Sequence, residues 1–377
     1  MKYIVKIGIL LTFIVCMTSC KSMYRIKLED IHLANIKASE KTKILYERIK
    51  TIPNDGFAFG HQDATIYGIN WKQPDSPLKI RSDIRDVSGK LPAVHGYDLG
   101  HIELNHSFNL DTVSFVLMRD QVKKMYKKGA IITFSWHLDN PVTDGSSWDT
   151  TAAVSEILKG GLKREKYEKW VSRLSIFFKS LKDEKDQPIP VVFRPFHEMN
   201  GGWFWWGEGN CSAEDYKELW RQTFMLLQQN NVQNLLFAYS LNIMQSKEDF
   251  ERYYPGDEYV DILGVDIYNY GGKEAFIKNI QTNLEILRSE AQKRSKPYAL
   301  TETGNINPGS DPDWWTENLY PGIKDSGIAW VLLWRNARLD HYFSTYKDDV
   351  TAEDFREFEK LEETLFLDQV KKINFKL

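Results

Sequence analysis

Short apolar runs alternate with amphipathic segments along most of the chain. Eight runs have the length and the aliphatic or aromatic content of buried strands, namely residues 57–59, 91–95, 130–136, 190–196, 235–241, 260–267, 298–301 and 328–334. Other segments repeat apolar residues at helical spacing, namely residues 37–50, 113–128, 165–182, 213–230, 274–293, 312–325 and 351–366. Strands that alternate with helices predict βαβ units and a parallel sheet.

Eight such strands in one chain predict an α/β fold of the (β/α)8 TIM barrel type, and the residues after each strand favour it over an open doubly wound sheet. Nearly every apolar run ends in polar or aromatic side chains. They include His61, Asp98, His137, Glu198, Asn242, Asp266, Glu302 and Arg335. A barrel collects the carboxyl ends of its strands at one mouth, where barrel enzymes bind their substrates, whereas an open sheet spreads them along an edge.

The composition is that of a folded protein with a large core, since 42% of the 377 residues are hydrophobic. The net charge of −3 gives no basic face, which argues against nucleic acid as a partner. We expect one folded domain over residues 37–377, which acts as a monomer and needs no cofactor or metal.

The first residues have the pattern of a bacterial secretion signal. Lys2 and Lys6 precede an apolar run that is too short to span a bilayer, and small residues lead to Cys20. This resembles a lipoprotein signal, which implies that residues 1–19 are removed, that Cys20 carries lipid and that residues 20–36 are a tether. The protein would then be anchored to a periplasmic or outer-membrane surface. The alternative is an ordinary signal peptide in which Cys20 has no role.

Two glutamates stand at strand ends that would face each other across the barrel mouth. Glu198 closes the fourth strand and Glu302 the seventh. Opposed carboxyl groups around a sugar-sized gap are suited to glycoside hydrolysis, in which one protonates the leaving oxygen and the other attacks the anomeric carbon. Burial of Glu198 beside tryptophans would raise its pKa, whereas Glu302 needs hydrogen-bond donors, and Tyr268 and Arg335 are the candidates.

Several tryptophans lie close to these strand ends. They are Trp203, Trp205, Trp206, Trp314, Trp315 and Trp334. Flat aromatic rings pack against the apolar faces of sugars, but buried tryptophans also fill cores. Trp203 and Trp334 both fall just past a strand end, so we expect these two to contact sugar and about half of the set to be core residues.

The segment RPFHEMNG at residues 194–201, followed by WFWWG at 203–207, closely resembles the acid/base segment of glycoside hydrolase family 26. Other strand-end segments resemble those of the same family in the same order. They are FGHQD at 59–63, SWH at 135–137, GVDIY at 264–268, TETG at 301–304 and WRN at 334–336. The resemblance extends over about residues 40–365.

This resemblance implies a retaining β-glycanase, most often an endo-β-1,4-mannanase acting on β-mannan or manno-oligosaccharides. It assigns the acid/base to Glu198 and the nucleophile to Glu302. It further implies that His197 and Tyr268 form hydrogen bonds with Glu302, and that Trp203 stacks against the leaving sugar. Trp334 would lie under the sugar that is cleaved, and His137 and Arg335 would hold the next sugar. Supporting or lining positions are implied for His61, Asp98 and Asp266. Exo release of mannobiose, or action on β-glucan or xylan, are the alternatives within the family.

Two other classes of function are less favoured. A metal-dependent hydrolase would use histidines, but His61-Gln62-Asp63 is not the His-x-His of barrel metalloenzymes. His101 and His106 are five apart, which does not place both on one helix face. A non-catalytic glycan-binding lipoprotein would keep the tryptophans but would not need two opposed glutamates.

Overall fold

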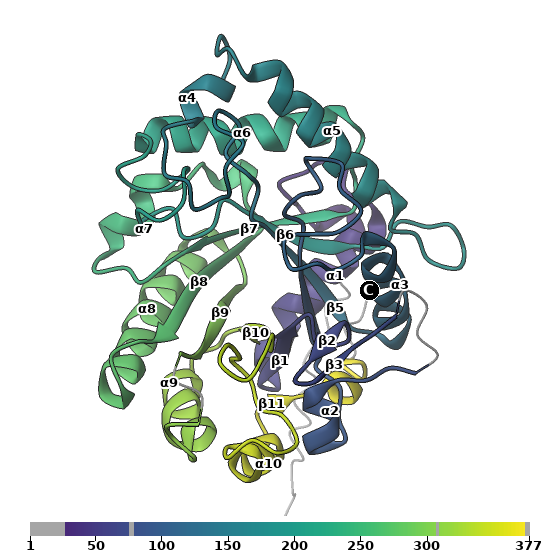
Figure 1. The fold of residues 1–377 in the computed structure, drawn as a ribbon, viewed down its shortest axis with the longest axis vertical. Helices are drawn as coiled ribbons and strands as arrows, with labels where there is room; N and C mark the ends of the chain where they lie inside the picture. The colour runs from purple at the N-terminus through teal and green to yellow at the C-terminus, as the bar shows by residue number, and fades with distance from the viewer. Residues whose placement is uncertain (1–26, 75–78, 307–308, 374–377) are drawn as a thin grey trace, which may run out of the picture.

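The computed structural model describes residues 27–74, 79–306 and 309–373 (Figure 1). The predicted signal at residues 1–19 and the predicted lipidation site Cys20 lie outside the described residues, so both stay predictions.

Eight parallel strands form a closed barrel, which confirms the predicted fold. They are β1 (Phe57–Gln62), β4 (Val94–Asp98), β5 (Ile131–Trp136), β6 (Val191–Pro195), β7 (Leu235–Leu241), β8 (Ile262–Asn269), β9 (Tyr298–Asn305) and β10 (Trp330–Leu333). Each strand pairs with the next in chain order, and β10 pairs with β1, from Ala58 opposite Trp330 to His61 opposite Leu333. This last pairing closes the ring and brings all the strand ends to one mouth.

Alternate residues of the strands enter two separate apolar clusters. In β6, Val192 belongs to one cluster, and Val191 and Phe193 belong to the other. The larger cluster includes residues of the surrounding helices, so it is the layer between strands and helices. The smaller one joins the strands to Leu45 and Ile49 of α1 (Glu40–Thr51), so α1 covers one end of the barrel interior. The period of two along buried strands therefore builds both layers.

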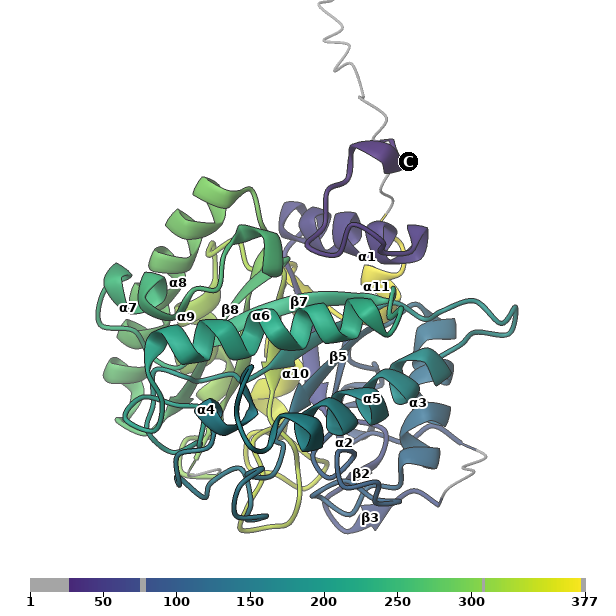
Figure 2. The same ribbon diagram turned by 90° about the horizontal axis from the view of Figure 1, so that it is seen from above.

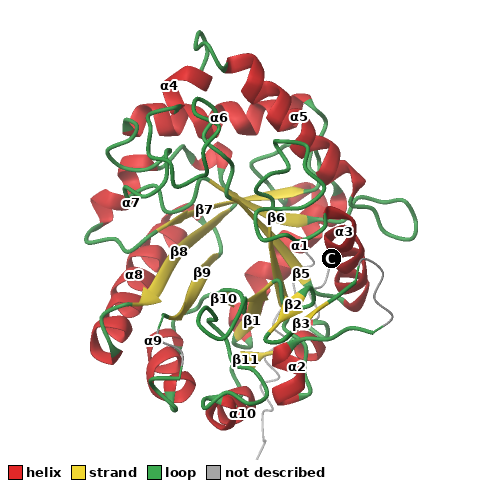
Figure 3. Ribbon diagram, in the orientation of Figure 1, coloured by secondary structure: helices red, strands yellow, loops and turns green. Residues whose placement is uncertain are grey.

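Helices surround the strands as an outer ring (Figure 3). Besides α1 they are α2 (Asp83–Ser88), α3 (Phe115–Lys128), α4 (Val154–Ile157), α5 (Arg164–Ser180), α6 (Ala213–Gln229), α7 (Lys247–Tyr253), α8 (Lys273–Arg294), α9 (Tyr320–Ile323), α10 (Ala352–Lys360) and α11 (Leu367–Val370). Single-turn or slightly longer helices of other types are η1 (Leu28–Asp30), η2 (Ile52–Asn54), η3 (Asp257–Tyr259) and η4 (Trp315–Leu319). No helix in the described ranges is long and apolar enough to cross a membrane.

The last predicted helix, at residues 351–366, is too long. Helix α10 ends at Lys360, and the chain then forms the two-residue strand β11 (Thr364–Leu365), which pairs with the start of β1. A second short pairing, the hairpin of β2 (Tyr67–Gly68) and β3 (Trp71–Lys72), follows β1. Strands of two residues are too short to produce a recognisable period, so the pattern did not predict them.

The packed part of the domain begins before the predicted boundary at residue 37. Ile31 and Leu33 are buried against the barrel, and the backbone N–H of Ala34 donates to Asp261 at 2.8 Å. In Figure 2 this segment lies beside α1, at the end of the barrel opposite the β2–β3 hairpin. The described chain therefore enters the domain on the face away from the strand carboxyl ends.

Candidate active site

A cleft of about 670 Å³ lies at the carboxyl ends of the strands. It gathers most of the predicted site residues, namely His137, His197, Glu198, Trp203, Tyr268, Glu302, Trp334 and Arg335. Its walls also contain residues that were not predicted as site residues, namely Leu110, Asp111, Trp148, Phe204, Asn242, Tyr270, His341 and Phe343. His61 and Asp266 lie buried beneath the cleft.

Glu198 is held by an irregular stretch of backbone directly after β6. Phe196 and Glu198 both have positive φ, of 47° and 56°, and the N–H of Glu198 donates to the Ser240 carbonyl at 3.0 Å. Such backbone is found where a fixed side-chain direction is needed. The indole N–H of Trp203 donates to Oε2 at 2.8 Å, and the Asn242 amide donates to Oε1 at 3.0 Å.

The surroundings of Glu198 favour its protonated form. Burial, and then the charges of Asp266 and Glu302, raise the pKa of Glu198 to about 8, although its two hydrogen bonds act in the opposite direction. At neutral pH the carboxyl group therefore keeps a proton that it can donate. This agrees with the predicted effect of burial, although of the three tryptophans only Trp203 bonds Glu198, since Trp205 and Trp206 donate to the Leu138 and His197 carbonyls.

Glu302 lies on β9 and accepts hydrogen bonds from donors that suit an anion. The Tyr268 hydroxyl donates to Oε2 at 3.0 Å, and the guanidinium of Arg194 bonds Oε1. Arg194 also contacts Asp266 at 2.7 Å and is itself buried. The prediction of Tyr268 as a partner is confirmed, but that of Arg335 is wrong. Arg194 takes this place, and its signal in the sequence is a charge inside an otherwise apolar strand.

The carboxyl groups converge at one point. Glu198, Asp266 and Glu302 each offer an oxygen, and these oxygens all lie within 4.8 Å of one another. Among the described residues, these three carboxyl groups are close enough together to hold a metal ion. Arg194 already places a cation against two of the three, so this set is better suited to an acid and a carboxylate than to a metal ion.

His137 is tied to Asp98 in the wall of the cleft. Nδ1 of His137 lies 2.6 Å from Asp98 Oδ2, and the Ser135 hydroxyl donates to the same oxygen at 2.6 Å. Burial lowers the pKa of His137, but the Asp98 carboxylate outweighs this and leaves that pKa above its usual value. The fixed imidazole is stacked with Trp148, with ring centroids 5.3 Å apart.

The resemblance implied a hydrogen bond between His197 and Glu302, but the structure shows none. Within the described residues its Nδ1 has no partner, and its ring packs edge-on against His137 at 4.6 Å. Burial, then Arg194 and His137, hold the pKa of His197 well below its usual value, so the ring is neutral. It therefore supports the site by packing.

The six tryptophans named from the sequence divide between the cleft and the core. Trp203 is 40% exposed and lines the cleft, as Trp334 does. The others are buried core residues, namely Trp205, Trp206, Trp314 and Trp315. Trp203 and Trp334 therefore line the cleft as predicted, but four of the six tryptophans, rather than about half, are core residues.

Arg335 is fixed at one end of the cleft. Its Nη1 lies 2.9 Å from Asp111 and 3.4 Å from the Tyr67 hydroxyl. His61 lies deeper, and burial lowers its pKa to about 3, which makes it a neutral group beneath the site.

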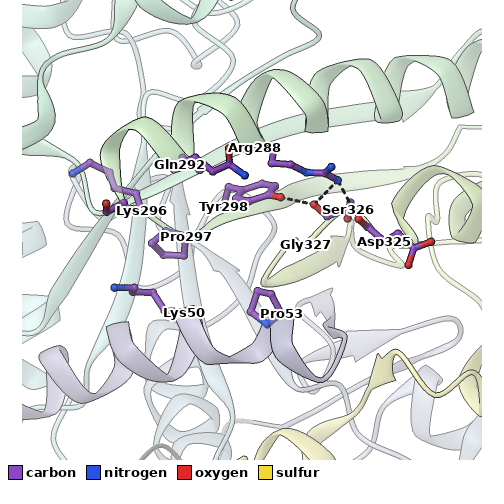
Figure 4. A pocket seen from close by; sticks show the side chains of 12 residues that line it. Lys50, Pro53, Arg288, Gln292, Lys296, Pro297, Tyr298, Asp325, Ser326 and Gly327 are labelled. Carbon is purple, nitrogen blue, oxygen red and sulfur yellow. Dashed lines mark hydrogen bonds between the residues drawn. The ribbon is translucent and has the colours of Figure 1, made fainter. Parts of the chain in front are cut away.

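A different pocket, of about 570 Å³, lies between α1 and α8 at the opposite end of the barrel (Figure 4). Arg288 donates there to the carbonyls of Asp325 and Ser326, at 3.0 and 3.1 Å. Lys50 and Lys296 line its rim. It has no opposed carboxyl groups and no exposed tryptophan, so the chemistry described above belongs to the cleft.

Comparisons with known proteins agree with this geometry. The family described as "Glycosyl hydrolase family 26" matches residues 34–307. A mannan endo-1,4-beta-mannosidase of Bifidobacterium adolescentis is 33% identical over 286 residues, which are 73% of this chain but 28% of that protein. The chain thus spans less than a third of that longer relative.

Solved structures of other proteins match a larger share of this chain. A GH26 beta-mannanase of Bacteroides ovatus has a TM-score of 0.84 at 40% identity, and the match covers 89% of this chain and 98% of that one. A modular endo-beta-1,4-mannanase of Cellulomonas fimi gives 0.84 at 28% identity, over 92% and 80% of the two chains. The family match covers most of the chain, and the cleft holds the paired glutamates on which the sequence resemblance rested. The chain belongs to glycosyl hydrolase family 26.

Proposed function

We propose that this protein is a retaining endo-β-1,4-mannanase that uses Glu302 as nucleophile and Glu198 as acid/base. One observation carries the proposal: two convergent glutamates have different surroundings, since the pKa of Glu198 is raised whereas Glu302 bonds the Arg194 guanidinium and the Tyr268 hydroxyl. Oxygens of the two groups approach within 4.8 Å. So short a gap suits a covalent intermediate better than the wider separation that an inverting enzyme needs for water.

In the first half of the reaction, a carboxylate oxygen of Glu302 bonds to the anomeric carbon while the glycosidic C–O bond breaks. The proton of Glu198 passes to the leaving oxygen, so the departing sugar is neutral. In the second half, ionised Glu198 takes a proton from water. The water oxygen bonds to the anomeric carbon and displaces Glu302, which restores both groups.

The other cleft residues would bind sugar on either side of this centre. Trp203, beside Glu198, would stack against the leaving sugar, and Trp334 would lie under the sugar that is cleaved. His137 and Arg335 would hydrogen-bond the next sugar on the non-reducing side. The ring of His197 would pack against His137 in the wall of the cleft. Beneath the cleft, His61 and Asp266 would support the residues that bind sugar.

Mannan is the proposed substrate because relatives of this chain are named as mannan endo-1,4-beta-mannosidases. Mannose differs from glucose in its axial 2-hydroxyl, and xylose also lacks the C6 arm; a site that bonds a hydroxyl rejects analogues without a hydroxyl in that position. Xylan and cellulose should therefore be poor substrates. Equal rates on mannan and on mixed-linkage glucan would favour the β-glucanase alternative.

Exo action is the second candidate, and the ion pair of Arg335 and Asp111 favours it. These two residues line both the cleft and a neighbouring pocket of about 600 Å³, so the pair stands between the two spaces. If it blocks longer chains, mannobiose would leave from chain ends. The viscosity of mannan would then fall slowly relative to the release of reducing ends, whereas endo cleavage lowers viscosity at once.

Two variants test the roles of the glutamates. Glu302→Ala should lose several orders of magnitude of activity on every substrate, because no glycosyl-enzyme can form. Glu198→Ala should be crippled on mannan but much less so on aryl glycosides whose leaving group needs no proton. Equal losses on a good leaving group would overturn the assignment, and a wild type that releases no reducing sugar would support the non-catalytic alternative.

We also propose that Cys20 carries a lipid that anchors the mature protein to a membrane surface. The support is the sequence pattern of residues 1–20 alone. Expression of Cys20→Ala should move the enzyme from the membrane fraction to the soluble fraction. An unchanged distribution would instead favour an ordinary signal peptide.

A further inference from the structure

Arg335 is held in an unusual way for a residue proposed to bind sugar. Both of its side-chain partners, the Asp111 carboxylate and the Tyr67 hydroxyl, contact the same nitrogen, Nη1. Nε is buried and has no partner within the described residues. A guanidinium has five N–H donors, so the two contacts fix its position and leave donors for a ligand in the cleft.

The Tyr67 hydroxyl can accept from Arg335 only if its own proton points elsewhere. Asp63 provides that second partner, because its Oδ2 accepts the Tyr67 hydroxyl at 2.9 Å. Asp63 comes directly after β1 and has a positive φ of 53°. Its N–H donates to the Gly96 carbonyl at 2.9 Å, so its backbone is tied to the neighbouring strand. The three side chains form one chain of hydrogen bonds from the barrel wall to the cleft.

The charges along this chain suit the same arrangement. Asp63 is fully buried, and burial, followed by the charge of Asp111, raises its pKa to about 8. Tyr67 and Arg335 act in the opposite direction, and Asp98 adds to the increase. Near neutral pH Asp63 is thus mainly an uncharged acceptor, and Asp111 is the counter-ion of Arg335.

We propose that Tyr67 is a positioning residue for Arg335, and that Asp63 sets the direction of the Tyr67 hydroxyl so that it faces the guanidinium. This inference rests on the proposed function, in which Arg335 holds the sugar next to the cleaved one. Tyr67 would affect binding of that sugar through Arg335, without a contact of its own to the reacting atoms.

The test compares Tyr67→Phe with wild type on two substrates that share one good leaving group, an aryl β-mannoside and the corresponding β-mannobioside. Only the second fills the position next to the cleaved sugar. Loss of one hydrogen bond to a charged group should lower kcat/KM on the mannobioside roughly tenfold, mainly through KM. The loss on the mannoside should be several times smaller. Tyr239→Phe is the matched control, because its buried hydroxyl donates to the Phe250 carbonyl at 3.0 Å, away from the cleft.

A double-mutant cycle separates positioning from a general defect. In an Arg335→Ala background, Tyr67→Phe should cause no further loss on the mannobioside. Asp63→Ala removes the acceptor of the Tyr67 hydroxyl and should lower the same ratio of rates in the same direction, so it serves as a second probe if Tyr67→Phe folds poorly. Equal losses on both substrates, or a full additional loss in the Arg335→Ala background, would overturn the inference.

The outcome also distinguishes this inference from the proposed function. If Arg335→Ala selectively impairs the mannobioside but Tyr67→Phe and Asp63→Ala do not, the positioning role fails and the mannanase assignment stands. If Arg335→Ala shows no selective loss, the role of Arg335 fails and that of Tyr67 fails with it.

Discussion

Replacing Trp203 by phenylalanine should shift the alkaline limit of activity upward. The indole N–H is one of two donors to Glu198, at 2.8 Å, and phenylalanine keeps an aromatic ring but removes this donor. A donor stabilises the carboxylate relative to the protonated acid, so its loss raises the pKa of Glu198 further above about 8. Because the acid must be protonated to act, kcat/KM on natural substrates should persist to higher pH.

The magnitude follows from the contact. A hydrogen bond to a charged group contributes about 1.5–3 kcal/mol, and one pKa unit corresponds to about 1.4 kcal/mol. Asn242 still donates to the other oxygen at 3.0 Å, and the smaller ring admits some water. We therefore expect the lower end of the range, a shift of about one unit.

The assay is the pH dependence of kcat/KM on a manno-oligosaccharide, from about pH 5 to about pH 10. Trp205→Phe is the matched control, since its N–H donates at 3.2 Å to the Leu138 carbonyl and does not contact Glu198. On an aryl glycoside that needs no proton the alkaline limb should be weak for every variant. An alkaline limb that stays in place, or moves to lower pH, would refute the reasoning.

Three further variants test other parts of the structure. Arg194→Met leaves two buried carboxyl groups without their cation and should lower the free energy of unfolding by about 3–5 kcal/mol, measured by urea denaturation; an unchanged midpoint would contradict this. Asp98→Asn removes the anion that raises the pKa of His137, so the imidazole should titrate at lower pH by NMR and kcat/KM on oligosaccharides should fall. Asp261→Ala removes the acceptor of the buried Phe237 N–H and of the partly buried Ala34 N–H, and should lower Tm with kcat nearly unchanged; an unchanged Tm would contradict this.

The fold could be predicted because its eight strands are buried on both faces and read as apolar runs. The polar side chains at the strand ends favoured a closed barrel over an open sheet, because Glu198 and Glu302 can face each other only around a common mouth. The short strands β2, β3 and β11 were missed because two residues carry no period. Their positions depend on contacts with β1 and with each other, which are tertiary.

The catalytic pair could also be predicted, whereas its electrostatic partners could not. Arg194 and Glu302 are 108 residues apart, and no local pattern relates them. No local pattern relates Arg335 to its partner either, because it forms an ion pair with Asp111 on the loop after β4 rather than with Glu302. Spacing along the chain indicates which strand end carries a side chain, but the partner that it bonds depends on how neighbouring loops fold over the mouth.

The short strand β11 has a consequence for how this protein is made. The start of β1 is flanked by β10 on one side and by β11 on the other, and β4 joins β1 only from Gly60 onward. Both flanking segments come from the last part of the chain. During synthesis the start of β1 therefore keeps both edges unpaired until residues 330–365 have emerged from the ribosome, so this part of the barrel wall cannot form before then.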